Sequence, residues 1–210
     1  MIFWITHEPL TGRNGIIVAV ALGLGFGLGS VPEVLASMPE WNPNGEEFAL
    51  KTTALYSFSY AVRMSYKSDN IPSGYYDYTV FPLEGEWDLI DKNIVSTDKS
   101  NYKYKIMIRQ PDFLTNDLFE WFLMGIKKKK PNPHLDKIVF ETNSEGLCCQ
   151  MLHIGSYDDE SASFRIMDKF CADNGYKRVC NKHREIYLSD PRKTEAHKLK
   201  TVLRYKVEIL

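Results

Sequence analysis

The sequence lacks the long apolar run that a membrane-spanning helix needs. Its apolar stretch at residues 15–29, GIIVAVALGLGFGLG, is shorter than the roughly 20 residues that cross a bilayer as a helix. The stretch also suits the apolar core of a signal peptide, but Glu8 and the alternating glycines oppose that interpretation. We therefore expect no membrane span and a cytoplasmic protein, with export through the N-terminal segment as the alternative.

Charge of one sign is not in excess, because 26 basic residues are balanced by 27 acidic residues and the net charge is −1. This balance gives no global electrostatic case for direct binding of nucleic acid. Cysteine is scarce, and the spacing of Cys148, Cys149, Cys171 and Cys180 matches no zinc motif. We expect reduced thiols, no bound metal and no cofactor.

Two common catalytic signatures are also missing. The chain contains no G-x-S-x-G nucleophile motif and no H-E-x-x-H metal helix, and the glycines between residues 23 and 29 lack the Lys-Ser/Thr of a nucleotide loop. What it does contain is aromatic side chains, 13% of the total, of which 12 are tyrosines. A chain of 210 residues with 44% hydrophobic and 25% charged residues suits a soluble globular protein of one large domain or two small lobes.

The hydrophobic spacing predicts an alternation of strands and helices after the NPNG turn at residues 42–45. Helices are expected at 46–67, 115–130 and 160–174, and strands at 74–89, 101–110, 137–142, 146–155, 183–190 and 199–209. The order is strand, helix, strand, strand, then a linking helix, then strand, helix, strand, strand. This order indicates a weak internal duplication of elements rather than of residues.

Glu185 is the leading candidate for a functional side chain. Period-two spacing in the strand HREIY places it on one sheet face with His183 and Tyr187. A buried carboxylate is costly unless it is paired, so such a group is usually kept for a function. The alternative is a surface carboxylate paired with Arg184 or Arg192.

Three further groups could contribute to a site made of carboxylates and aromatic rings. The groups are Glu84, Glu86 and Trp87 in PLEGEW, His153 and Tyr157 in HIGSYDDE, and Tyr60, Met64, Tyr76 and Tyr78 around the first helix. Four of these residues have an ordinary structural interpretation: Glu84 as a turn glutamate beside glycine, Trp87 as a core tryptophan, His153 as a packed histidine, and Tyr157 as a side chain that fixes the start of the third helix. Such a site can hold a flat apolar or cationic ligand by stacking and cation–π contacts, and a carboxylate can position water or donate a proton.

Several segments together resemble the GyrI-like small-molecule-binding family over about residues 42–207. They are SYAVRMS, YDYTVFPLEGEW, QMLHIGSYDDE and EIYLSDPRKT. The resemblance implies an α+β fold in which two strand–helix–strand–strand modules, related by a pseudo-two-fold axis, form a concave antiparallel sheet with the helices on one side. The modules would span about 31–110 and 137–207, joined by helix 115–130, after a divergent apolar segment at 1–30. Pro39 departs from the pattern, because it interrupts the first strand that the family expects before the NPNG turn, here VPEVLASMPEW at residues 31–41.

The resemblance also implies a function. The same fold serves as the effector-binding domain of multidrug-responsive regulators, where a glutamate at the pocket base faces cationic aromatic drugs, and Glu185 matches that position. A stand-alone subfamily with a similar LEGxW and HIGxYDDE pattern hydrolyses cyclopropane-bearing DNA alkylators inside an aromatic cage. Trp87, Tyr157, Tyr60 and Tyr76 would be its counterparts.

We therefore expect a binder of aromatic or cationic xenobiotics, with Glu185, Tyr187 and the four aromatic counterparts as ligand-binding residues. The alternative is a hydrolase in which Glu185 or Glu84 assists proton movement. A third interpretation is a protein-interaction module that acts on a DNA enzyme. The sequence leaves open whether the protein is a monomer or a dimer.

Overall fold

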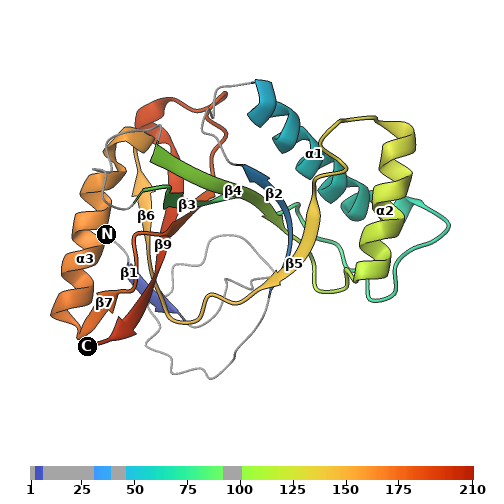
Figure 1. Ribbon diagram of the computed structural model, residues 1–210. Helices are drawn as coiled ribbons and strands as arrows, with labels where there is room; N and C mark the ends of the chain where they lie inside the picture. Colours follow the sequence, from blue (N-terminus) through green and yellow to red (C-terminus); the bar gives the residue numbers. More distant parts are fainter. Residues whose placement is uncertain (1–2, 7–30, 39–45, 92–100) are drawn as a thin grey trace. The chain divides into compact units, whose positions relative to one another are not determined.

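The computed structural model describes the backbone of residues 3–6, 31–38, 46–91 and 101–210, and the side chains of 46–91 and 101–210. Within these residues the fold combines α-helices with antiparallel strands, so the predicted α+β class is confirmed (Figure 1). The helices are α1 (Glu46–Arg63), α2 (Asn116–Lys129) and α3 (Glu160–Asp173). The strands are β1 (Phe3–Thr6), β2 (Val31–Met38), β3 (Leu83–Leu89), β4 (Tyr102–Arg109), β5 (Val139–Asn143), β6 (Cys148–Ile154), β7 (Tyr176–Arg178), β8 (His183–Tyr187) and β9 (Lys200–Ile209).

By packing, these elements fall into two compact units whose members are interleaved along the chain. Unit 1 comprises residues 1–29, 84–95 and 144–210, and unit 2 comprises residues 30–83 and 96–143. Strand β3 thus belongs almost entirely with the C-terminal elements, whereas α2, expected from the sequence as a linker, belongs with α1.

In unit 2, strand β2 pairs antiparallel with both β4 and β5. Alternate residues of β4, from Tyr104 to Ile108, are buried on one face, as the sequence pattern predicts. Phe48 of α1 lies against Tyr104, and Phe119 of α2 stacks on Phe140 of β5 at a ring distance of 5.6 Å. Both helices therefore cover the same face of this sheet.

The two helices of unit 2 also pack on each other. The ring of Phe58 in α1 lies 5.0 Å from that of Phe119 in α2, and both side chains are buried. Gln110, at the end of β4, donates from its side-chain amide to the hydroxyl of Ser59 and ties the strand to α1. Thr115 caps α2 through a bond from the backbone N–H of Leu118, as expected for a threonine at this position.

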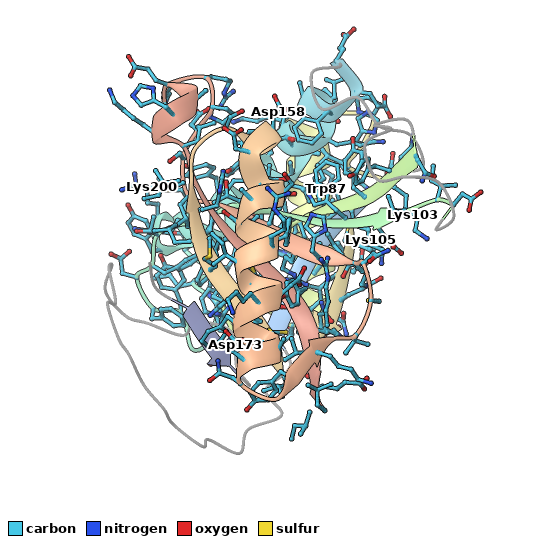
Figure 2. The ribbon with its side chains drawn as sticks, turned by 90° about the vertical axis from the view of Figure 1, so that its left-hand side faces the viewer. Trp87, Lys103, Lys105, Asp158, Asp173 and Lys200 are labelled. Carbon is cyan, nitrogen blue, oxygen red and sulfur yellow. The ribbon has the colours of Figure 1, made fainter. Side chains whose placement is uncertain are left out.

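In unit 1, the paired strands follow the order β1, β6, β9, β8, β3, and β7 pairs with the C-terminal end of β9. Helix α3 covers one face of this sheet, as Figure 2 shows with Asp158 at the N-terminal end of the helix and Asp173 at its C-terminal end. The core between them is formed by buried side chains of β6, β9 and α3: Cys149, Met151, Met167, Cys171, Leu203, Tyr205 and Val207. We call this side of the sheet the α3 face.

The structure shortens one predicted strand and adds two. Residues 74–82 are not in a strand, so only the second half of the predicted segment 74–89 forms β3. Strands β1 and β7 were not expected, and β2 extends as far as Met38, just before Pro39. Gly175 ends α3 with φ at +78°, a left-handed conformation that glycine adopts without strain. The glycine-rich stretch 15–29 lies outside the described residues.

No helix in the described part of the chain is both long enough and apolar enough to cross a membrane.

Candidate functional site

Strand register places Glu185 on the α3 face of unit 1. Glu185 pairs with Leu203 of β9, and Leu203 packs in the core beneath α3. His183 and Tyr187 share this face because side chains alternate along a strand, as the sequence pattern predicted. Phe164 of α3 lies edge-on to the His183 ring at 4.8 Å, which confirms that the helix covers this part of the strand. Glu185 itself is only 7% exposed.

Both oxygens of the Glu185 carboxylate accept hydrogen bonds from side chains of its own strand. The Tyr187 hydroxyl donates to Oε2 at 2.8 Å, and His183 Nε2 donates to Oε1 at 3.1 Å. Trp87 Nε1 in turn donates to the Tyr187 oxygen at 3.1 Å. The result is a directed chain from indole to phenol to carboxylate, in which each group orients the next.

The arginines considered as surface partners of Glu185 lie elsewhere. Arg192 pairs with Asp190, and Arg184 pairs with Glu84 and Glu145. The alternative of an exposed carboxylate paired with one of these arginines is therefore wrong.

Tyr157 brings an aromatic ring from the turn before α3 to this cluster. It lies in the short 3-10 helix η3 (Tyr157–Asp159), and its ring is edge-on to that of Tyr187 at 5.8 Å. Tyr157 is 36% exposed, so this end of the cluster reaches solvent. Burial, and then the charge of Glu185, raise the pKa of Tyr157 to about 12 and hold the pKa of Tyr187 well above its usual value. Both hydroxyls therefore stay protonated.

Glu160, the first residue of α3, is a member of this cluster that the sequence analysis missed. It is buried, and burial together with the neighbouring charge and hydrogen bond of Glu185 raises the pKa of its carboxyl far above the usual range. From the sequence alone, this residue is expected only as the start of a helix. Its helical spacing to the buried Ser163 and Met167 was the signal that it points inward.

Gly85 makes room for the aromatic part of the cluster. It pairs with Glu185 across the β3–β8 ladder, directly below the indole and phenol groups. A Cβ atom at this position would lie 2.7 Å from Trp87 Nε1 and 2.8 Å from the Tyr187 oxygen. Any larger residue would therefore collide with the hydrogen bond that holds the two rings.

His153 supports the site without belonging to it. Its Nδ1 bonds the Ser163 hydroxyl at 2.9 Å, and its Nε2 bonds the backbone carbonyl of Ser156 at 3.0 Å. Because a carbonyl oxygen only accepts, the Nε2 carries the proton and Nδ1 accepts from serine. The packed, hydrogen-bonded histidine considered from the sequence is the arrangement that the structure shows, and it holds the turn that presents Tyr157.

Glu84, the second carboxylate proposed from the sequence, lies on the opposite face of the sheet from Glu185. It pairs with Arg184 at 3.0 Å, and Arg184 also contacts Glu145. Glu145 continues to Arg204 at 2.6 Å, whose Nε donates to Gln150. Burial opposes the ionised form of Glu145, but the two arginines outweigh it and lower its pKa. These charges are compensated within the network, so Glu84 and Glu185 do not form one constellation.

The remaining predicted ligand-binding residues, Tyr60 and Tyr76, belong to unit 2. Tyr60 is 55% exposed on α1, and Tyr76 lies among other rings, 5.9 Å from Tyr78 and 5.7 Å from Phe113. Arg63 lies over the Tyr78 ring at 5.8 Å. Their participation in the same site as Glu185 stays a prediction.

Within the residues that the structure describes, no group of three or more histidine, cysteine, aspartate and glutamate side chains is arranged to hold a metal ion.

The structure defines an α+β domain with an antiparallel sheet and a carboxylate buried among aromatic rings. The model of one protein family, the GyrI-like small molecule binding domain, matches residues 43–207. The chain belongs to this family.

Solved structures from Listeria innocua are similar to the chain over most of its length. One, an uncharacterised conserved protein, is 33% identical with a TM-score of 0.79, and the match covers 86% of this chain and 89% of that one. Another, described as a hydrolase, is 31% identical with a TM-score of 0.77 and the same coverage.

The C-terminal domain of EcmrR shares only the fold, at 15% identity and a TM-score of 0.51 over 86% of this chain and 93% of that one. No curated protein matches the chain.

Proposed function

We propose that unit 1 binds flat aromatic molecules, with a preference for cations, at the cluster formed by Glu185, Tyr187, Trp87 and Tyr157. The observation that carries this proposal is the buried Glu185 carboxylate, joined by hydrogen bonds to Tyr187 and through it to Trp87, with the partly exposed Tyr157 ring against Tyr187. An aromatic cation gains from both parts of such a site, because the rings stack with it and the carboxylate attracts its charge. Membership of a small-molecule-binding family supports the same conclusion.

A matched pair of fluorescent probes tests this proposal. N-methylacridinium carries a permanent charge, whereas acridine has the same ring system and is uncharged above neutral pH. We expect Glu185→Gln to weaken binding of N-methylacridinium by about tenfold or more, which corresponds to about 1.4 kcal/mol, and to affect acridine much less. Tyr157→Ala should weaken both probes, because the ring contact does not depend on charge.

Glu208→Gln is the control, since Glu208 is an exposed carboxylate of β9 that pairs with Lys177. Equal affinity of the wild type and Glu185→Gln for every probe, with the fold intact by circular dichroism, would remove Glu185 from the site.

Hydrolysis of a reactive small molecule is the second candidate function. Its specific support is the similarity to a Listeria innocua protein described as a hydrolase, at 31% identity over most of both chains. In this interpretation Glu185 accepts a proton from an attacking water, and the aromatic side chains hold the substrate, for which a strained cyclopropane-bearing alkylator is the proposed class.

Incubation of the protein with such an alkylator, followed by mass spectrometry, distinguishes the two candidates. A catalyst converts an excess of substrate into a product heavier by one water, and Glu185→Gln should abolish the turnover. A binder leaves the compound unchanged in mass.

A further inference from the structure

Glu160 and Glu185 bring two buried carboxyl groups together from elements that are separate in sequence. Glu160 begins α3, and Glu185 lies in the middle of β8 beneath that helix. Both are 7% exposed, and two ring contacts that flank them, Tyr157 with Tyr187 and Phe164 with His183, place Glu160 over Glu185. Two carboxyl groups that share a buried site repel each other when both are ionised, so one of them holds a proton.

The groups around the pair identify which carboxyl holds the proton. Glu185 accepts from Tyr187 and His183, so its ionised form is well satisfied. Glu160 Oε1 has no hydrogen-bond partner among the described residues, so the ionised form of Glu160 would leave a buried oxygen unsatisfied. The proton therefore belongs to Glu160.

The other charged and titratable groups near the pair include no lysine or arginine that compensates a second negative charge. From the η3 turn, Asp158 adds a negative charge that opposes ionisation of Glu160, and Tyr157 stays protonated. From β3 the facing residues are Gly85 and Trp87, which do not titrate. From β8, His183 lies 3.1 Å from Glu185 and is positively charged only when protonated. In the described part of the chain, no lysine or arginine forms an ion pair with Glu160 or Glu185.

One local feature favours the ionised form, and it is too weak to prevail. Glu160 lies at the positive end of α3, but a helix dipole contributes only about 0.3–1 kcal/mol to a surface carboxylate. Two carboxyl groups that share a buried site repel each other more strongly than this when both are ionised, so one of them keeps a proton. The pair as a whole therefore carries one negative charge.

We propose that this carboxyl pair exchanges its proton for the positive charge of a bound aromatic cation. The proposal rests on the proposed function and specifies how the site responds to a cationic ligand. When the cation binds, the O–H bond of Glu160 breaks, the proton passes to the solvent, and the pair changes from one negative charge to two. The arriving cation supplies the positive charge that the surrounding residues lack.

Proton release on binding has a thermodynamic consequence. Affinity for a permanent cation must rise with pH, by up to about tenfold for each pH unit if a full proton is released, because proton and cation compete for the same pair. A neutral aromatic ligand brings no charge, so its affinity should not depend on pH through this pair.

Two measurements test the proposal, and the first needs no ligand. Infrared spectra of the unliganded protein near neutral pH should contain the C=O stretch of a protonated carboxyl group, and Glu160→Gln should remove it. The second measurement is calorimetry of N-methylacridinium binding in two buffers of different ionisation enthalpy, which counts released protons. We expect release approaching one proton per cation for the wild type, and none for Glu160→Gln or for acridine.

His183→Gln is the control for the imidazole, which also lies against Glu185. It should retain proton release, because the proton leaves Glu160 and not the imidazole. Loss of release in His183→Gln with retention in Glu160→Gln would overturn the proposal. So would an infrared spectrum without a protonated carboxyl group, or cation binding without proton release. Failure of both probes to bind would instead reject the proposed function, and the exchange with it.

Discussion

At the scale of single residues, Tyr187 is the centre of the candidate site. Its hydroxyl donates a hydrogen bond to Glu185 and accepts one from Trp87, and its ring forms an edge-to-face contact with the ring of Tyr157. A hydroxyl that donates and accepts at once transmits orientation along the chain, because moving one partner misaligns the other bond. The geometry of Glu185 therefore depends on side chains of three separate segments.

The first prediction concerns Gly85, whose missing side chain leaves space for this contact. Gly85→Ala places a methyl group 2.7 Å from Trp87 Nε1, so the indole must move and its hydrogen bond to Tyr187 should break. We expect a loss of about 1–3 kcal/mol in the free energy of unfolding, which is the usual cost of overpacking, and a shift in tryptophan fluorescence. Urea titration measures the free energy of unfolding.

Gly125→Ala is the matched control for this substitution. Gly125 lies in α2, and a Cβ atom there meets nothing within 4 Å. Because alanine favours the helix, this variant should be more stable by about 0.5–1 kcal/mol. A Gly85→Ala protein as stable as the wild type would show that the indole is not confined as we describe.

At the scale of elements, strand β8 serves different purposes on its two faces. On the α3 face it presents the candidate site, and on the other face Arg184 joins β3, through Glu84, to Glu145 before β6. The two faces are only one residue apart in sequence, so Glu84 and Glu185 play separate roles although their strands are paired. The ion-paired face fits a structural role, which leaves Glu185 as the carboxylate available to a ligand.

The second prediction tests that structural role. Arg184→Met should destabilise the protein by about 3–5 kcal/mol, because it leaves the buried Glu84 carboxylate without this ion pair. The double variant Glu84→Gln with Arg184→Met should recover part of the loss, since no buried charge then lacks its partner.

Arg192→Met provides the comparison, because Arg192 forms an exposed pair with Asp190 and its loss should change unfolding very little. Similar losses for Arg184→Met and Arg192→Met in urea titrations would contradict the buried network.

At the scale of the whole molecule, Glu160 should make stability depend on pH. Its pKa is raised in the folded protein, so the folded and unfolded states are both protonated below the unfolded pKa of about 4.3. Above that value only the unfolded state loses its proton, and the contribution of this group to stability declines as pH rises towards the folded pKa. The protein should therefore lose stability between mildly acidic and alkaline pH.

The third prediction follows for Glu160→Gln. The amide resembles the protonated carboxyl and cannot ionise, so the variant should show a flatter dependence of unfolding free energy on pH. At alkaline pH it should be more stable than the wild type by about 1–2 kcal/mol, for a shift of one or more pKa units.

Asp158→Asn is the control, because Asp158 lies on the exposed turn just before Glu160. This variant should change the pH dependence of the unfolding free energy much less than Glu160→Gln does. If the unfolding free energies of the wild type and Glu160→Gln depended on pH in the same way, the assignment of a proton to Glu160 would be wrong.

Much of this architecture could be predicted from local patterns. The alternation in HREIY correctly placed His183, Glu185 and Tyr187 on one face, and the apolar spacing of the three helices located them to within a few residues. Strand β3 was predicted too long, because tyrosines at 76 and 78 favour a strand locally but pack against other rings instead. Glu160 was missed because an acidic residue at a helix start is normally explained by the helix dipole.

Periodicity within a segment determines which side chains of that segment share a face, and this is local information that the chain carries residue by residue. Which segments meet is a different matter. Residues far apart in the chain meet at three places in this fold. Gly85 pairs with Glu185, Glu84 pairs with Arg184 on the opposite face of the sheet, and Glu160 approaches Glu185. Long-range packing selects these contacts, because burial and charge compensation are properties of the assembled fold.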